Sequence, residues 1–238
     1  MPEELMIEDR DADAPGVERI WRSHSDRGGP FLSIAESRFE MVVSRHQGRT
    51  FITLRGPETK ATTADCPPDG EWLGIRFAHG TYMPAVPPAE VRDRRDATLP
   101  GASARAFWLD GSAWEYPDFE NADTFVARLY RRGLLVRDPV VAAVLRGEVD
   151  ARSVRTAQRH VLRATGLPQR AIVQIDRARY ATQLLRAGRS ILDVVHEAGY
   201  YDQAHLTRSL THRIGLTPLQ IARRVEPLSY LYKTTPPR

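Results

Sequence analysis

Cysteine is nearly absent from this chain of 238 residues, because Cys66 is the only one. A single cysteine cannot form an intramolecular disulfide bond and is too few for a thiolate zinc site. We interpret Cys66 as a small buried or loop residue.

Long apolar runs are also missing, since none approaches the roughly 20 residues that a membrane-spanning helix needs. The acidic start of the chain, residues 1–15, does not have the layout of a signal peptide. We therefore expect a cytoplasmic protein with no membrane partner, and we expect these first residues to form a loose acidic tail.

Motifs for catalysis and for metal binding are absent as well. His24, His46 and His79 are isolated in different segments, and no G-x-S-x-G, H-E-x-x-H or glycine-rich phosphate loop occurs. The pair His196-Glu197 lacks a second histidine four residues later. The sequence predicts that the protein is not an enzyme and has no catalytic residue, no metal and no cofactor.

Charge is present but unevenly divided. Residues 1–120 carry 14 Lys and Arg against 21 Asp and Glu, whereas residues 121–238 carry 20 against 9. The first half has a balance of −7 and the second of +11. This asymmetry is typical of a basic nucleic-acid-binding half attached to a region that need not touch DNA.

Residues 190–214 have the pattern of two short helices joined by a tight turn. Ser190 is a good N-cap, Gly199 suits a left-handed turn, and Asp202 can cap the second helix. Tyr200 can fill the angle between the helices. The second helix, residues 202–214, places polar side chains opposite its apolar stripe, as a helix that enters a major groove does. An ordinary amphipathic helical hairpin is the alternative.

The same plan occurs earlier in the chain, where residues 153–165 form a second candidate recognition helix. Ser153 takes the place of Asp202, and Gly166-Leu167 takes the place of Gly215-Leu216. A leading helix is expected at residues 138–147, followed by a longer connection, EVDARS. With this connection the first unit could supply mainly phosphate contacts and the second most of the base reading, or the reverse.

The motif S-I-x-D-V-x-x-x-A-G-Y-x-D-Q-x-H-L-x-R, followed by G-L-T-P, resembles the DNA-binding domain of the AraC/XylS family of bacterial transcription regulators. The resemblance covers residues 138–224. It implies two helix-turn-helix units, joined by a rigid helix, that enter adjacent major-groove segments of double-stranded DNA. A connecting helix over residues 168–185 would be about 27 Å long. DNA-repair alkyltransferases with such a segment use cysteine clusters, which this chain lacks.

The resemblance and the helical faces together predict the residues that contact DNA. They are Arg155, Gln158, Arg159 and Arg163 in the first unit, and Gln203, Ala204, His205, Arg208 and His212 in the second. The resemblance also implies a small-molecule effector, a homodimer, and RNA polymerase as a partner if the protein activates transcription.

The first half is expected to be rich in β-strands. Residues 38–45 and 49–56 form a predicted hairpin, residues 71–77 another strand, and residues 105–109 and 112–116 a second hairpin around Asp110-Gly111. Residues 58–69 are expected to be a loop. We expect an α+β protein with two domains: a small β-rich barrel or half-sandwich, residues 1–118, a linker helix, residues 119–137, and a helical DNA-binding domain with a tail, residues 138–238.

Aromatic residues are concentrated in the predicted β-rich half. A ligand site formed by Trp72, Phe77, Trp108 and Trp114 is one interpretation, and ordinary core packing explains them equally well. The amphipathic segment 121–135 is expected to bridge the two domains, and its apolar side either packs on the β-rich half or serves dimerisation, as such a segment can in related regulators. The alternative for the whole chain is an enzyme or ligand carrier that keeps a vestigial DNA-binding half.

Overall fold

A computed structural model of the protein describes residues 6–93, 95–148 and 154–224. The first half is built mainly from antiparallel strands. The main sheet has the order β1-β2-β7-β4-β5-β9, and the described strands do not close into a barrel. Its strands are β1 (Met6–Arg10), β2 (Val17–Ser25), β7 (Gly70–Phe77), β4 (Glu40–His46), β5 (Arg49–Arg55) and β9 (Ala97–Thr98).

Three small sheets accompany the main one. They pair β3 (Gly29–Ser33) with β6 (Thr62–Cys66), β8 (Thr81–Tyr82) with β13 (Val136–Arg137), and β10 (Gly101–Ser103) with β11 (Ala106–Leu109) and β12 (Ser112–Glu115).

Both predicted hairpins are confirmed. In the β4-β5 hairpin, Gln47 and Gly48 have φ values of 50° and 71°, and in the β11-β12 hairpin, Asp110 and Gly111 have 49° and 69°. Positive φ at both central residues is the requirement of the two-residue turns that match the twist of paired strands. The turn residues therefore determine these hairpins locally.

Two expectations were wrong. Residues 6–10, expected in a loose tail, form the edge strand β1, and residues 62–66, expected in a loop, form β6. Strand β2 carries arginines that neutralise the acidic residues of β1, with Arg22 paired to Glu8 and Arg19 to Asp9, each at 2.6 Å. The charge run that suggested a solvated tail thus has its counter-charges on the neighbouring strand of the sheet.

The core of the β-rich region lies on one face of the main sheet. Met41, Val43, Leu73 and Ile75 alternate toward it from β4 and β7, and helix α1 (Ala122–Arg131) packs against them. The α1 residues Phe125, Val126 and Leu129 are buried there, as predicted, whereas its arginines are exposed. Of the two predicted roles for this segment, the structure has it packing on the β-rich region.

The second half is helical. Its helices are α2 (Pro139–Leu145), α3 (Val154–Thr165), α4 (Gln169–Arg186), α5 (Ile191–Glu197), α6 (Gln203–Arg213) and α7 (Pro218–Ala222). Helices α3 and α6 begin at Val154 and Gln203, directly after the two residues that the sequence repeat aligns, Ser153 and Asp202. The repeat in the sequence is therefore a repeat in the structure. The predicted long connecting helix is α4.

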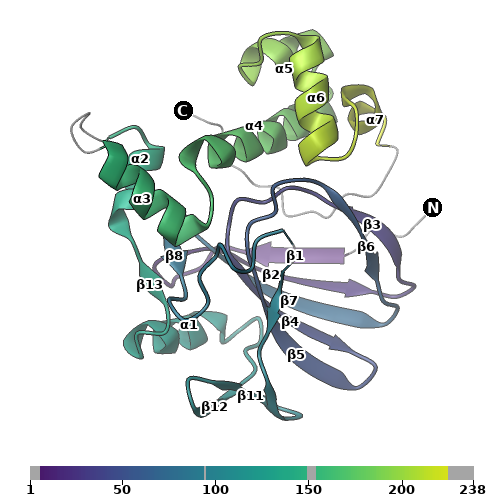
Figure 1. The fold of residues 1–238 in the computed structure, drawn as a ribbon. Helices are drawn as coiled ribbons and strands as arrows, with labels where there is room; N and C mark the ends of the chain where they lie inside the picture. Colours follow the sequence, from purple (N-terminus) through teal and green to yellow (C-terminus); the bar gives the residue numbers. More distant parts are fainter. Residues whose placement is uncertain (1–5, 94, 149–153, 225–238) are drawn as a thin grey trace.

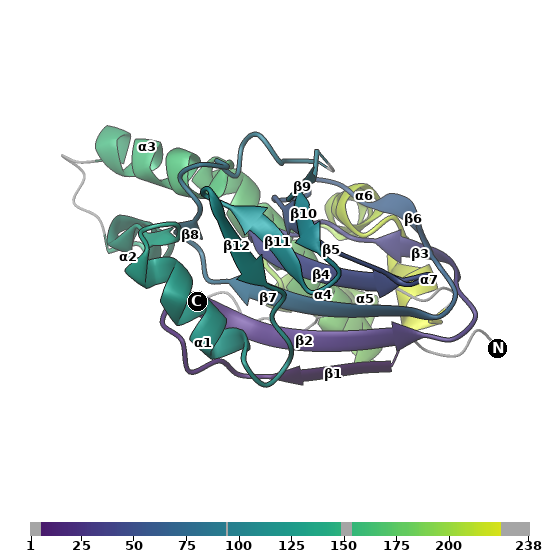
Figure 2. The same cartoon turned by 90° about the horizontal axis from the view of Figure 1, so that it is seen from below.

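The layers can be followed in Figures 1 and 2. Helices α4 to α7 lie on one side of the main sheet, and α1 with the β11-β12 hairpin lies on the other. In Figure 1, α4 runs between α3 and α6, so one helix carries both predicted recognition helices.

Candidate nucleic-acid interface

The second helix-turn-helix unit has the capped geometry that its sequence predicts. The Ser190 side chain accepts a hydrogen bond from the Asp193 N–H at 3.1 Å, and Asp202 accepts one from the His205 N–H at 2.6 Å. Gly199 has a φ of 69°, the left-handed conformation that favours glycine. Tyr200 is 6% exposed and fills the angle between α5 and α6.

The first unit is built around Asp138, which caps α2 by accepting a hydrogen bond from the Val140 N–H at 3.1 Å. The same carboxylate also accepts from His160 at 2.6 Å and from Arg163 at 3.0 Å, so it ties α2 to α3. Burial would raise the pKa of Asp138, but these hydrogen bonds lower it below its usual value. The predicted α3 cap, Ser153, lies outside the described residues.

Helix α4 contributes apolar side chains to the cores of both units and also presents a polar row between α3 and α6. Arg170, Gln174 and Arg177 follow at i, i+4 and i+7 and line a hollow between α3 and α6. This hollow, of about 740 Å³, also receives Gln158 and Leu162 of α3 and His205 of α6. A second hollow continues it along α6 past Arg208 and His212. Helices α3 and α6, the two predicted recognition helices, therefore border one concave surface with α4 as its floor.

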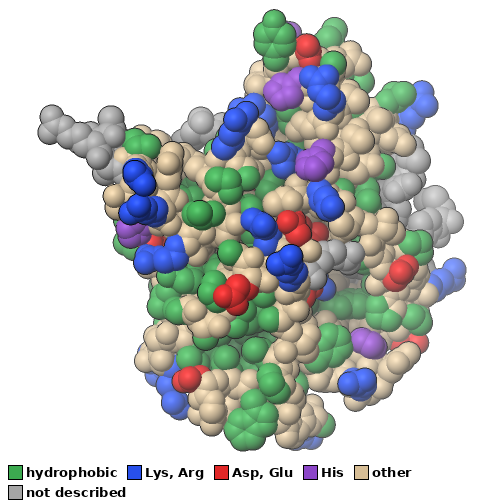
Figure 3. All heavy atoms as spheres, in the orientation of Figure 1, with side chains coloured by type: hydrophobic (Ala, Val, Ile, Leu, Met, Phe, Trp, Pro, Cys, Tyr) green, Lys and Arg blue, Asp and Glu red, His purple; other side chains and the backbone are tan. Residues whose placement is uncertain are grey.

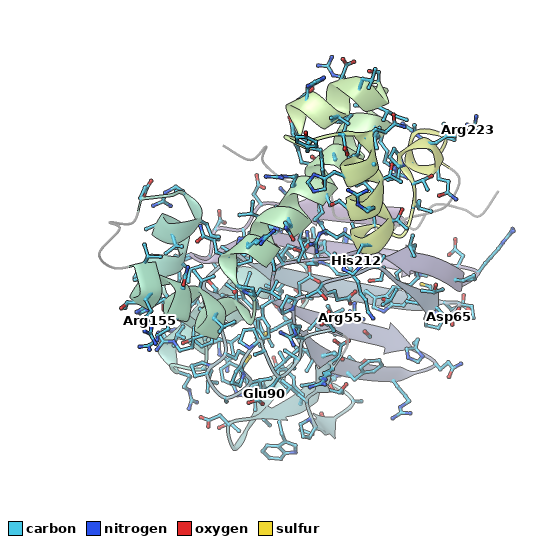
Figure 4. All side chains as sticks on the ribbon, turned by 45° about the horizontal axis from the view of Figure 1, so that its top comes forward. Arg55, Asp65, Glu90, Arg155, His212 and Arg223 are labelled. Carbon is cyan, nitrogen blue, oxygen red and sulfur yellow. The ribbon has the colours of Figure 1, made fainter. Side chains whose placement is uncertain are left out.

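Most predicted DNA contacts have exposed side chains. This holds for Arg155, Gln158, Arg159 and Arg163 on α3 and for Gln203, Ala204, Arg208 and His212 on α6. Figure 4 labels Arg155 on α3 and His212 on α6, at either side of α4. In Figure 3, blue arginine and lysine side chains gather over the same row of helices. Among the described residues, no ion-pair partner is found for Arg155, Arg159 or Arg208.

Two predicted residues have additional roles inside the fold. His205 is half-buried, with its ring edge-on to Tyr200 at 5.1 Å between centroids. Arg163 is 62% exposed at its side chain while it pairs with Asp138. Both therefore help to hold their units together at the border of the concave surface.

The sequence analysis did not predict the α4 residues that form the floor of the concave surface, Arg170, Gln174 and Arg177. Gln174 accepts a hydrogen bond from Arg213 at 2.6 Å, and the Arg177 guanidinium lies 5.7 Å from the centre of the Tyr200 ring. Burial lowers the pKa of Arg213 and raises that of Tyr200. The i, i+4, i+7 spacing of Arg170, Gln174 and Arg177 was the signal that could have identified this face.

The four predicted ligand residues do not share one space. Phe77 and Trp114 are buried in the core beside α1, and Trp114 donates a hydrogen bond to the Leu109 carbonyl at 3.2 Å. Trp72 packs over Gly70, while Trp108 is 47% exposed. Cys66 lies half-buried in β6, and burial raises the pKa of its thiol.

Within the described ranges, no group of three or more His, Cys, Asp or Glu side chains could hold a metal ion. No helix in the same ranges is long and apolar enough to cross a membrane.

Comparison with known proteins agrees with this geometry. Residues 151–224 match the model of a family described as "Helix-turn-helix domain", which is of the AraC type. Residues 151–224 are therefore a helix-turn-helix domain of the AraC type. No curated protein and no solved structure matches the chain. The match to the AraC-type domain covers α3 to α7, that is, both recognition helices and the helix that joins them, and it is consistent with a regulator of the AraC/XylS family.

Proposed function

We propose that the protein regulates transcription by binding one face of double-stranded DNA, with α3 and α6 in adjacent segments of the major groove. The observation that carries this proposal is the pair of recognition helices, which are equivalent in the sequence repeat and mounted on the single helix α4. The 18 residues of α4 span about 27 Å, which is comparable to the roughly 34 Å between successive turns of one groove.

Base reading is assigned to the outer faces of the two helices. Arg159 and Arg208 are equivalent in the repeat, and an arginine fork can donate two hydrogen bonds to a guanine edge. Gln158 and Gln203 suit adenine in the same way. Leu162, which is 50% exposed at the border of the concave surface, offers an apolar contact to a thymine methyl group.

Phosphate binding is assigned to the basic residues that surround these reading faces. Arg155 lies in the first turn of α3, and Arg170 and Arg177 lie on the floor between the recognition helices. Contacts of this kind fix register and orientation and do not read sequence. The arrangement supports a binding protein whose affinity depends strongly on salt.

Control by a small molecule belongs to the same proposal and would act through the β-rich region, residues 1–118, alone or by changing a homodimer. Trp72 and Trp108 support it best, because these two predicted ligand residues keep exposed surface while Phe77 and Trp114 are in the core. A metabolite screen by thermal shift tests this part. A true ligand raises the melting temperature of the full chain, and Trp72→Ala abolishes that shift.

The proposed function is tested by measuring the affinity of the full chain for selected duplex DNA as salt is varied. If about six phosphates are contacted, affinity falls on the order of a thousandfold between 50 and 200 mM salt. In the same assay, Arg105→Ala should bind DNA as the wild-type protein does. This exposed arginine lies in the turn before β11, and β11 is on the far side of the main sheet from α4. A flat salt response, or no DNA binding, removes the proposal.

A further inference from the structure

Residues 32–38, which run from the end of β3 to the start of β4, lie between the two helix-turn-helix units. Ile34 and Ala35 are 3% and 0% exposed although they are neighbours in an irregular segment. Ile34 belongs to the core of the second unit, with Leu206 and Leu210, whereas Ala35 belongs to the core of the first unit. Two consecutive residues of the β-rich region therefore enter two different helical cores.

The backbone of this segment is bonded to the helical region in two directions. The Ala35 N–H donates to the Arg213 carbonyl at 2.8 Å, and the Arg179 guanidinium donates to the Ala35 carbonyl at 3.0 Å. Outside this segment but also in the β-rich region, the Ala61 N–H donates to the His212 carbonyl at 3.1 Å. The Arg213 and His212 carbonyls belong to the last turn of α6, where carbonyls have no partner inside their own helix. The β-rich region thus caps the second recognition helix.

A buried ionic cluster attaches the same segment to α4. Glu36 contacts Arg179 at 3.1 Å, Arg38 at 3.2 Å and Arg76 at 3.4 Å. Burial would raise the pKa of Glu36, but the three arginines hold it well below its usual range, so this carboxylate stays charged.

Asp176, three residues before Arg179 on the same face of α4, accepts hydrogen bonds from Ser37 at 2.9 Å and from Arg38 at 3.4 Å. The contacts of Glu36 with Arg179 and of Asp176 with Ser37 and Arg38 therefore connect the segment to two positions of α4 that lie about one helical turn apart.

Each recognition helix also ends against the β-rich region at a glycine. A Cβ at Gly166 would lie 2.7 Å from the Ala89 nitrogen, and one at Gly215 would lie 2.8 Å from Leu32. Both glycines have positive φ, and both occupy the same place in the repeat. The β-rich region therefore touches the two units at equivalent points.

We infer that residues 32–38 set the relative placement of the two recognition helices, and thereby the spacing between half-sites that the protein can bind. This inference rests on the proposed function. Because one base pair turns the duplex by about 35° and moves the groove by about 3.4 Å, two rigidly held helices accept one spacing and reject its neighbours. If the segment did not hold them, the two units could adjust to several spacings.

The test begins with half-sites obtained by selecting random DNA on the full chain. The two half-sites are then placed at spacings that differ by one base pair, and affinities are measured. The wild-type protein is expected to prefer its best spacing over the neighbouring ones by about tenfold or more. A wild-type protein that binds no DNA, or that shows no pair of half-sites, refutes the proposed function before any variant is made.

Two variants then test the segment itself. Glu36→Gln removes the charge among three arginines, and Ser37→Ala removes the hydroxyl that donates to Asp176. We expect the spacing preference to fall to about threefold or less in both, with affinity for an isolated half-site unchanged. Glu71→Gln is the matched control, because this exposed residue of β7 carries the same charge away from α4.

A folded variant that keeps the wild-type ratio between spacings overturns the inference, because a segment that only stabilises the fold would leave that ratio unchanged. Melting curves establish which variants are folded. If Glu36→Gln does not fold, Ser37→Ala decides alone, since it leaves every buried charge paired.

Discussion

The two helix-turn-helix units share a plan in their recognition helices and differ in their turns. Helices α3 and α6 begin at equivalent positions of the repeat, whereas the leading helices α2 and α5 end at different distances before them. Residues 146–153 connect the helices of the first unit, and the shorter run 198–202 connects those of the second. The repeat is thus closest in the helices that would meet DNA, while the turn behind them differs between the units.

Their cores also differ. Leu206 and Leu210 in the second unit correspond to Ala157 and Val161 in the first, and all four are buried. At about 0.8 kcal/mol for each buried methylene, the leucine at position 206 contributes about 2 kcal/mol more than the alanine at 157. At these two positions the second unit therefore buries larger apolar side chains, whereas the first unit has the additional polar contacts of Asp138 with His160 and Arg163.

The largest expected effect concerns this difference in packing. Leu206→Ala should lower the free energy of unfolding by about 2 to 5 kcal/mol, because it leaves a cavity in a core where the side chain is 0% exposed. Denaturant unfolding of the full chain measures it. Leu162→Ala, at an exposed position of α3, should change stability by less than about 0.5 kcal/mol. Equal losses in the two variants would contradict the assignment of Leu206 to a well-packed core.

The next effect concerns equivalence of the reading faces. Replacing Arg159 or Arg208 with alanine should weaken binding of the selected site by about 1 to 3 kcal/mol and relax preference at one base position in its own half-site. Binding to a randomised site library measures both quantities. If one variant lowers affinity evenly for all sequences, with a smaller salt slope, that unit holds phosphate and the other unit does the reading.

A third prediction concerns the cluster that holds both units. His79 donates to the Ser37 hydroxyl, at 2.9 Å, because that hydroxyl donates to Asp176. Burial and the nearby Arg38 charge lower the pKa of His79 to about 4, although Asp176 and Glu36 oppose this. The folded protein thus keeps His79 neutral, and the unfolded chain takes up the proton near pH 6.5.

Because only the unfolded chain takes up this proton between pH 6.5 and 4, the folded protein keeps its full stability above pH 6.5 and loses part of it as the pH falls toward 4. Between pH 7 and 5.5 the loss should be about 1.2 kcal/mol. Unfolding of the wild type and of His79→Gln at both pH values measures it. The change in the free energy of unfolding between pH 7 and 5.5 should be smaller by this amount in the variant than in the wild type. An equal change in both proteins would contradict the assignment of a neutral, buried His79 in the folded protein.

The smallest effect concerns the helix caps. Asp202→Ala should cost ~1 kcal/mol, because the first turn of α6 loses the acceptor for the His205 N–H. Asp202→Asn is the control, since asparagine retains an acceptor oxygen and removes only the charge. Thermal unfolding compares the two variants. If both lose the same stability, the charge at the N-terminus of α6 matters and the cap hydrogen bond does not.

The sequence by itself determined the features that depend on neighbours in the chain. The caps Ser190 and Asp202, the turn glycine Gly199 and the hairpin turns at Gln47-Gly48 and Asp110-Gly111 all act within a few residues. The repeat of the two units and the exposed arginines of α3 and α6 followed from helical periodicity. These local rules predicted the exposed faces of α3 and α6, and the resemblance of the motif in residues 190–218 to AraC/XylS regulators predicted the AraC-type domain. That the exposed faces read bases stays a prediction.

Only the tertiary structure decided what depends on distant partners. Strand β1 was not recognised because its acidic residues are neutralised by β2, and β6 was not recognised because its partner β3 lies beyond the whole β4-β5 hairpin in the chain. The polar floor formed by α4 and the insertion of Ile34 and Ala35 into two helical cores also depend on residues that are distant in the chain. A buried glutamate such as Glu36 looks like a surface residue in a sequence, because its three arginine partners meet only in the folded chain.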